Sequence, residues 1–438
     1  MIHWIYTAIV RPRITYAALV WWPKTKIKNA QKKLKKLQRL ATISITGATS
    51  STPSKALDSI LSLLPLHLFV QLEAEKNALR LRRTKKLFDG DLRGHLSILK
   101  DFKINPILTH EDWMDRQYNF ERLFHVTETS RTEWESGGPN IQPGSIIFYT
   151  DGSKLNNKVG TGVTGPGVDI SISMGQWPTV FQAEIQAIIE CAIVCLRRNY
   201  RNANICIFSD SQAALKALKS VSCSSKLVWE CIQLLQQVAR KSTINLFWVP
   251  GHCGIEGNEK ADQLAKAGSI KPFIGPEPFC GVSECTIKME LKNWEKSMID
   301  DVWKKNLTAR QSKKFISPNK TITQKLLSLS KKDLRTYCGL VTGHCASKYH
   351  LKQLGKLEDD TCRFCNLESE NAEHLLCYCV ALLHKRKTFF DMTLIQPSDV
   401  WMNSPNKAIN FIRCIIPYWD NAVDQQVEIT HTNSDTTP

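Results

Sequence analysis

The sequence lacks a long hydrophobic segment. The apolar stretch at residues 1–22 is interrupted by Arg11-Pro12-Arg13, so it fits neither the hydrophobic core of a signal peptide nor a membrane span. We therefore expect an intracellular protein, in the nucleus or the cytoplasm rather than secreted, with no membrane partner. In a reducing compartment most of its 15 cysteines are free thiols, and some are metal ligands where their spacing allows.

Acidic residues are scarce near the N-terminus. Residues 1–100 hold 19 Lys and Arg against five Asp and Glu, which accounts for 14 of the 17 excess positive charges. A field of this sign favours polyanionic partners, either nucleic acid or an anionic membrane surface. The alternative is a solubilising surface. The same choice applies to the basic amphipathic run from Lys24 to Arg39, which is either a binding face or a solvated helix face.

The length of 438 residues exceeds one ordinary core and predicts two to four domains. Strands alternating with helices in the middle of the chain indicate an α/β domain. A run of prolines and a polar tail mark the remaining boundaries. We predict a helical region at 1–88, a linker region at 89–144, the α/β domain at 145–269, a helical C-terminal region at 286–426 with a Cys/His cluster at 361–385, and a disordered tail at 427–438.

Four acidic residues of the α/β domain occupy places that make sense together. Asp151 and Asp210 each end an apolar strand. If these strands are parallel neighbours, both carboxylates emerge at one edge of the sheet, where α/β sites lie. Glu184 is predicted in the first turn of a helix packed on the sheet, and Asp262 one turn into the last helix of the domain.

This acidic quartet suits phosphodiester hydrolysis. The reaction needs an activated water and relief of charge on the entering and leaving oxygens, which two divalent ions about 3.5–4 Å apart provide when oxygen ligands hold them. The sequence therefore predicts a Mg²⁺ or Mn²⁺ site that cuts a nucleic-acid backbone. His252, on a glycine-containing loop, is positioned to shuttle protons or to help product leave. Its alternative role is that of an ordinary surface histidine.

The acids lie within a set of five motifs in a fixed order. Together they resemble a type 1 ribonuclease H of the variety carried by retrotransposons. The resemblance implies a five-stranded mixed sheet with flanking helices, two Mg²⁺ or Mn²⁺ ions, and cleavage of RNA in an RNA–DNA hybrid. It also implies that the four acids hold the metal and that His252 assists. The motifs are Tyr149-Thr150-Asp151-Gly152-Ser153, Gln182-Ala183-Glu184, Ser209-Asp210-Ser211-Gln212, Val249-Pro250-Gly251-His252 and Gly257-Asn258-Glu259-Lys260-Ala261-Asp262.

The same resemblance assigns substrate contacts, with two departures from the family pattern. Many cellular members have Asn or Gln before the helix glutamate to sense RNA 2′-hydroxyl groups, whereas here only Gln182 is available. A basic handle found in some members is replaced by a short serine-rich turn at Ser220–Ser225. Positions that contact the substrate backbone in some members correspond to Gly152, Ser153, Asn157 and Gln212.

Four stretches of the N-terminal region form a second family pattern. They are residues 9–18, Trp21-Trp22, Leu37-Gln38-Arg39 and Ile45-Thr46-Gly47-Ala48. Together they resemble the thumb-like segment at the end of a non-LTR retrotransposon reverse transcriptase, and the resemblance implies a fragment of a retrotransposon polyprotein. No Tyr/Phe-X-Asp-Asp motif of a polymerase palm is present, so we expect no polymerase activity.

The C-terminal cluster has metal-ligand spacing. Cys362, Cys365, His374 and Cys377 form a C-x2-C-x8-H-x2-C pattern that can close one tetrahedral Zn²⁺ site, with Cys379 and His384 as substitutes. The alternative is a group of reduced structural cysteines. The cluster resembles the region that follows ribonuclease H in the same retrotransposons, which implies a nucleic-acid-binding or scaffolding module.

Several functions remain open from the sequence. The leading hypothesis is a metal-dependent ribonuclease acting on RNA–DNA hybrids. A catalytically inactive nucleic-acid-binding remnant is the main alternative, and the complete acidic quartet argues against it. A zinc-dependent interaction protein is the third hypothesis. A DNA transposase or integrase is the fourth, although its acids would need different spacing.

Overall fold

The computed structural model describes residues 1–83, 97–98 and 105–417. The predicted tail at 427–438 and the junction between the first two predicted regions lie outside these residues. Among the described residues, unit 1 comprises 1–78, 97–98 and 293–417, and unit 2 comprises 79–83 and 105–292. Within the described chain, no helix combines the length and hydropathy that a membrane crossing needs.

Unit 2 is built on a mixed six-stranded sheet with the order β2-β8-β6-β3-β4-β5. The central strand β3 (Ile146–Leu155) is parallel to β6 (Asn204–Ser209) and antiparallel to β4 (Lys158–Gly165). This arrangement confirms the predicted α/β class and the parallel pairing that brings Asp151 and Asp210 to one edge. The remaining strands are β2 (His125–Thr127), β5 (Val168–Gly175) and β8 (Thr243–Trp248).

The sixth strand comes from the region expected to be a linker. Strand β2 pairs in parallel with β8, so the sheet has one strand more than the five expected. A second ribbon pairs β1 (Gln117–Tyr118) with β7 (Ser222–Cys223). Helix α8 (Arg131–Glu135) carries Trp134, whose Nε1 donates to the carbonyl of Trp248 at 2.9 Å. Residues 105–144, most of the described part of this region, are therefore built into unit 2.

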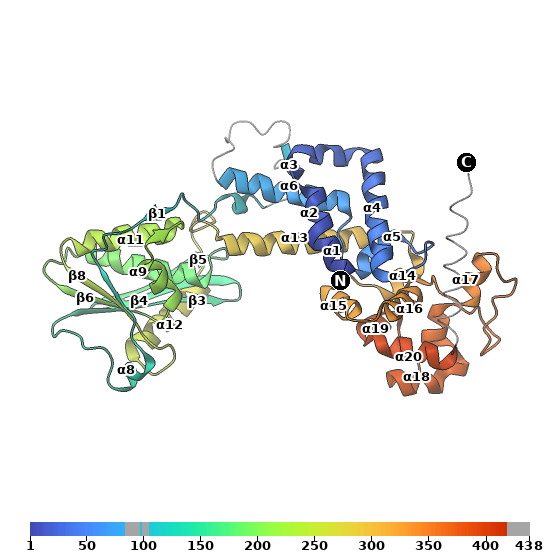
Figure 1. The fold of residues 1–438 in the computed structure, drawn as a ribbon. Coiled ribbons are helices and arrows are strands. Elements are labelled where there is room, and N and C mark those ends of the chain that lie inside the picture. The colour runs from blue at the N-terminus through green and yellow to red at the C-terminus, as the bar shows by residue number, and fades with distance from the viewer. Residues whose placement is uncertain (84–96, 99–104, 418–438) are drawn as a thin grey trace. The chain divides into compact units, whose positions relative to one another are not determined.

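Helices cover both faces of the sheet (Figure 1). Helix α9 (Val180–Arg197) packs against β3 and α11 (Lys226–Ala239) on one face, and α12 (Glu256–Ile270) lies against β3, β4 and β5 on the other. Helix α9 begins with a capping box between Thr179 and Gln182, which satisfies backbone N–H groups at its N-terminus. The short helix α10 (Gln212–Lys219) follows β6.

Unit 1 joins helices from the two ends of the chain in one core. Ala56, Leu57 and Ile60 of α5 are buried in the same cluster as Trp401 and many apolar side chains beyond residue 300. The sequence presented these regions as separate domains, whereas they pack together. The helical segments are α1 (Ile2–Ile5), η1 (Tyr6–Val10), α2 (Arg11–Thr15), α3 (Ala18–Trp21), η2 (Trp22–Lys26), α4 (Lys28–Thr46), α5 (Ser54–Ile60), α6 (Leu66–Arg83), α13 (Glu284–Lys304), α14 (Arg310–Phe315), α15 (Lys320–Leu327), α16 (Lys331–Thr342), α17 (Lys348–Gln353), η5 (His374–Tyr378), η6 (Val380–Leu382), α18 (Leu383–Phe390), α19 (Pro397–Met402) and α20 (Pro405–Ile415).

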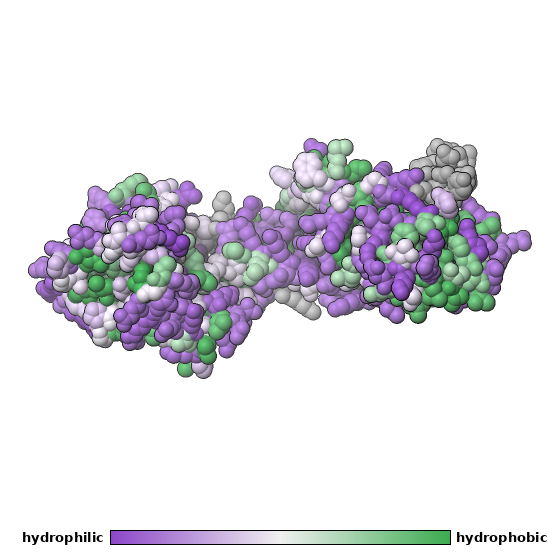
Figure 2. Space-filling model, turned by 90° about the horizontal axis from the view of Figure 1, so that it is seen from below, coloured by the Kyte–Doolittle hydropathy of each residue, from purple (hydrophilic) through white to green (hydrophobic). Residues whose placement is uncertain are grey.

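Hydrophilic residues cover most of the face shown in Figure 2, in both units. Many large apolar side chains are buried in the cores, as Phe148 and Phe208 are in unit 2, whereas others, such as Trp4 and Tyr16, are exposed. This division is the ordinary consequence of removing apolar surface from water.

Candidate active site

Three predicted acids meet at one edge of the sheet in unit 2. Asp151 lies in β3, Asp210 follows β6, and Glu184 lies near the N-terminus of α9. One carboxylate oxygen from each lies within 4.8 Å of the others. Asp151 and Glu184 are only 6% and 4% exposed, and Asp210 is half-buried.

Two glycines allow the helices to approach the sheet at this edge. A Cβ atom on Gly152 would lie 2.6 Å from the backbone nitrogen of Glu184, so only glycine lets the first turn of α9 settle against β3. On the opposite face, a Cβ atom on Gly162 would lie 2.2 Å from the carbonyl oxygen of Ala261. This close packing holds α12 against β4 and brings Asp262 beside the cluster.

The cluster concentrates negative charge in a partly dry environment. Burial, followed by the charges of Asp210 and Asp262, raises the pKa of Asp151 to about 7. Burial and the charges of Asp151 and Asp210 raise the pKa of Glu184 well above its ordinary value. Burial also raises the pKa of Asp210, although the nearby His252 opposes this effect.

The donor set fits hard divalent cations. Glu184 Oε2 is buried and has no hydrogen-bond partner within the described residues. An unpartnered buried carboxylate oxygen is costly unless a cation meets it. Mg²⁺ and Mn²⁺ prefer oxygen ligands of this kind. The cluster is therefore chemically suited to the metal that the sequence predicts.

Asp262 and His252 form an adjoining group with a further acid, Glu259. Their ligand atoms lie within 4.8 Å of one another. Asp262 Oδ2 accepts a hydrogen bond from Lys266 at 2.6 Å, and His252 is exposed on its loop with a left-handed φ of 55°. Glu259 was not among the predicted site residues. Its signal was present, because it precedes Asp262 by three positions on one helix face.

The residues predicted to contact the substrate differ in their exposure to solvent. Asn157 is exposed in the β3–β4 turn, and Gln212 is exposed as the first residue of α10. Ser153 is half-buried beside them in β3, and Gly152 is buried against α9. The first three are therefore available to a ligand at this edge.

Gln182 has a different role in this structure from the one predicted. It is 1% exposed, and its Nε2 donates to Asp112 Oδ2 (3.2 Å) and to the carbonyl of Gly281 (2.7 Å). The Asp112 carboxylate also accepts hydrogen bonds from Ser225 Oγ (2.8 Å) and from the backbone nitrogen of Leu227 (3.1 Å). Asp112 and Gly281 lie in segments that the sequence did not predict beside α9, and they occupy the side-chain amide of Gln182. Gln182 thus anchors the first turn of α9.

The Cys/His cluster of unit 1 also comes together, with one change of ligand. Sulfur atoms of Cys362, Cys365 and Cys379 and a ring nitrogen of His374 lie within 4.8 Å of one another. Cys379 takes the place predicted for Cys377, because a π-helical turn follows His374 and the nitrogen of Cys379 donates to the His374 carbonyl at 2.7 Å. Cys377 is instead buried in the apolar core. His384, the other substitute, is exposed and is not in this group.

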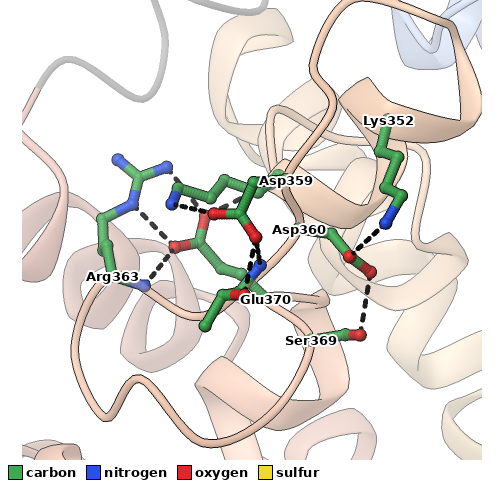
Figure 3. Close-up of polar contacts among 8 residues, drawn as sticks. Lys352, Asp359, Asp360, Arg363, Ser369 and Glu370 are labelled. Atoms are coloured by element: carbon green, nitrogen blue, oxygen red, sulfur yellow. Dashed lines mark hydrogen bonds and ion pairs between the residues drawn. The ribbon is translucent and has the colours of Figure 1, made fainter.

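Acidic side chains brace the loop that carries these ligands (Figure 3). The Glu370 carboxylate, fully buried, accepts hydrogen bonds from Arg363 Nε and from a terminal nitrogen of the same guanidinium, both at 2.7 Å. Asp360 accepts from Lys352 and Ser369. His374 Nδ1 lies 2.9 Å from Glu368 Oε2, the kind of contact that orients metal-binding histidines.

A comparison with known families bears on unit 2. Residues 143–270 match the family model of RNase H. The matched range contains the acidic quartet, His252 and strands β3 to β8, whereas β1, β2, α8 and Asp112 precede it.

Proposed function

We propose, on the premise that residues 143–270 form an RNase H domain, that this protein hydrolyses the RNA strand of RNA–DNA hybrids. The observation that carries the proposal is the convergence of Asp151, Glu184 and Asp210 at one sheet edge, with a buried carboxylate oxygen that no group in the described part of the chain satisfies. Asp262 adjoins them and completes the predicted quartet. Mutual repulsion among these acids is relieved by bound cations, which gives the site affinity for metal.

Each protein group has a defined task in this proposal. Asp151, Glu184, Asp210 and Asp262 would hold two Mg²⁺ or Mn²⁺ ions. Such ions, when bound, lower the pKa of a nucleophilic water and offset charge on the phosphate oxygens. The exposed imidazole of His252 is placed on a loop beside Asp210 to take and release a proton at a ring nitrogen as product leaves.

The proposal also covers which strand of the hybrid is cleaved and where the protein originates. Ser153, Asn157 and Gln212 are available at the site edge for backbone contacts, and contacts to 2′-hydroxyl groups are what distinguish RNA from DNA. With Gln182 occupied, selectivity depends more on the shape of the hybrid. The resemblance of residues 9–48 to a retrotransposon reverse transcriptase supports an origin in the C-terminal part of such a polyprotein.

The test is cleavage of a hybrid labelled on each strand, in Mg²⁺ or Mn²⁺, by the full chain and by Asp210→Asn. Asp169→Asn is the matched control, because Asp169 is exposed and pairs with Lys260 rather than with the cluster. We expect metal-dependent cleavage of RNA alone, retained in the control and reduced by at least about 100-fold in Asp210→Asn. Binding without cleavage by the unmodified chain in either metal would instead favour the inactive remnant.

A second function is favoured by the Cys/His geometry in unit 1. We propose that Cys362, Cys365, His374 and Cys379 hold one structural Zn²⁺ ion, in a module that binds nucleic acid or acts as a scaffold. Hydrogen bonds to the Cys365 sulfur outweigh its burial and lower the pKa of this thiol to about 6, which favours the thiolate that binds metal.

The ligand assignment can be tested by metal analysis of two matched variants. Cys379→Ser should lose zinc, whereas Cys377→Ser should keep it and lose only core packing. Equal zinc in both variants, or none in the unmodified protein, would contradict the site.

A further inference from the structure

Unit 1 contains a basic cavity remote in sequence from both clusters. Its volume is about 530 Å³, within the range of roughly 300–1,000 Å³ that ligand sites occupy. Helices α4 and α5, the start of α6 and the end of α13 form its walls. Six positively charged side chains line it against one carboxylate, that of Asp58; the six are Lys28, Lys32, Lys35, Arg39, Lys55 and Lys305.

Four of the cations form a row along one face of α4. Lys28, Lys32, Lys35 and Arg39 are spaced by four, three and four residues, which places them on one side of a helix. The row runs over 12 residues, and its 11 steps span about 16 Å at 1.5 Å per residue. Lysines 33 and 36 of the same helix do not line the cavity. One face of α4 therefore directs its basic side chains to the cavity, whereas Lys33 and Lys36 lie outside it.

The cavity lysines receive only partial charge compensation, from the buried carboxylate of Asp58 near Lys35. Within the part of the chain that the structure describes, no carboxylate forms an ion pair with Lys28, Lys32, Lys35, Lys55 or Lys305. Other surface lysines of this protein do pair, as Lys314 does with Glu373. Unpaired lysines gathered around a hollow indicate that the missing partner is an external anion.

Arg39 is fixed without being neutralised. Its guanidinium donates to the carbonyl of Thr52 (2.8 Å), to Ser54 Oγ (2.7 Å) and to the carbonyl of Ser50. These neutral acceptors hold the side chain in place and leave its charge available to a ligand. An ordered cation of this kind lowers the entropy cost of binding.

The cavity also has a fixed inner surface. Gln38, 3% exposed, donates to Asp58 Oδ1 at 2.7 Å and accepts from the Tyr6 hydroxyl at 3.2 Å, which ties α4 to α5 and η1. Beside this polar anchor lie apolar lining residues from two elements, Leu66 and Leu68 of α6 and Val302 of α13. A ligand with both anionic and apolar parts would match this lining.

We propose that this cavity binds a single strand of nucleic acid, with backbone phosphates along the α4 row and one base against the apolar lining. A strand carries one phosphate per about 3.4 Å in a stacked form, so roughly five phosphates pass along a 16 Å row. A linear row favours an extended polyanion over a compact phosphate. The choice of nucleic acid among polyanions rests on the proposed nuclease function of unit 2.

Two matched double variants test the site in the full chain. Lys32→Gln/Lys35→Gln removes two lining charges, and Lys33→Gln/Lys36→Gln removes two charges from the same helix outside the cavity. Binding of a labelled single-stranded oligonucleotide is measured by fluorescence anisotropy without added Mg²⁺ or Mn²⁺, between 50 and 200 mM salt. We expect the first variant to lose about tenfold in affinity, with a salt slope less steep by about 1.4, and the second to change much less.

The opposite wall provides an independent variant. Lys305→Gln, from beyond α13, should weaken binding further when combined with the first double variant. Equal losses in the two double variants would overturn the proposal, since the effect would then belong to the general field of the helix. A heparin fragment that competes as well as the oligonucleotide, charge for charge, would overturn the assignment to nucleic acid.

Cleavage assays separate this proposal from the nuclease function. At saturating hybrid, Lys32→Gln/Lys35→Gln should retain the unmodified rate, because unit 2 is unchanged. If the unmodified chain does not cleave the hybrid but the variant still loses oligonucleotide binding, the cavity proposal stands and the nuclease proposal is rejected. If the variant cleaves normally and binds the oligonucleotide as tightly as the unmodified chain, the nuclease proposal stands and the cavity proposal is rejected.

Discussion

Removing one carboxylate from the acidic cluster should stabilise the metal-free protein. In Asp151→Asn the amide oxygen can still accept the hydrogen bond from the backbone of Gly152, and a neutral group replaces a carboxylate whose charge is disfavoured first by burial and then by Asp210 and Asp262. The carboxylates that suit the site to metal binding thus lower the free energy of unfolding of the metal-free protein.

The size of the effect follows from the pKa of Asp151. Its rise from 3.8 to about 7 corresponds to about 4 kcal/mol at 1.36 kcal/mol per pKa unit. Glu184 and Asp210 share this repulsion, so we expect a gain of about 2–3 kcal/mol in the free energy of unfolding of unit 2. For a unit of this size, that gain raises Tm by roughly 4–10 °C.

The pH dependence has a definite sign. A raised carboxyl pKa disfavours the charged folded form, so the penalty in the unmodified protein is absent below about pH 4, grows with pH, and is complete above about pH 7. Asp151→Asn should therefore melt higher than the unmodified chain at pH 8 in EDTA, and the difference should disappear near pH 4.

Differential scanning calorimetry of the full chain measures this difference. The transition of unit 2 is identified as the one that shifts when excess MgCl₂ is added to the EDTA-treated unmodified protein. The variant should lose most of that shift. A variant that melts lower than the unmodified chain at pH 8 in EDTA, with a preserved Mg²⁺ shift, would refute the electrostatic reasoning.

Three further predictions concern the support of the site. Asp112→Ala removes the acceptor of three hydrogen bonds and should destabilise unit 2 by about 2–4 kcal/mol, with a larger loss in cleavage rate than in hybrid affinity; an unchanged melting temperature would contradict this. Lys266→Ala frees Asp262 and should lower the half-saturating Mg²⁺ concentration about twofold, since an i,i+4 pair is worth about 0.3–0.5 kcal/mol; a higher Mg²⁺ requirement would exclude competition. Trp134→Ala should cost unit 2 about 2 kcal/mol by chemical denaturation, and no loss would show that α8 is only loosely attached.

The acidic site was predictable because the acids lie near strong local signals. Asp210 follows the apolar strand β6, and Asp151 lies one residue past the last β3–β6 pair, although β3 itself continues to Leu155 rather than ending at Asp151 as expected. The parallel pairing of β3 and β6 is the simplest way to join them. Glu184 follows a capping residue, Thr179, that marks the start of α9. Local chemistry therefore fixed the positions of the ligands along the chain.

The support of the site was not predictable from local signals. Strand β2 has three residues, too few to show a period of two, and its partner β8 is more than 100 residues away. Asp112 has no motif around it, and the partners of its carboxylate come from two separate segments, at Gln182 and at residues 225–227. The choice of Cys379 over Cys377 depends on a π-helical turn, which spacing alone does not reveal.

The discontinuous core of unit 1 also has a consequence for biosynthesis. Leu57 and Phe411 belong to one buried cluster but are separated by more than 350 residues. Helix α5 therefore cannot bury its apolar face fully until most of the chain has been synthesised. At about 5–20 residues per second the ribosome needs roughly 20–70 s to make that interval. Unit 2 is complete within this time, so it can fold first, while the apolar side chains of α5 stay exposed on the growing chain.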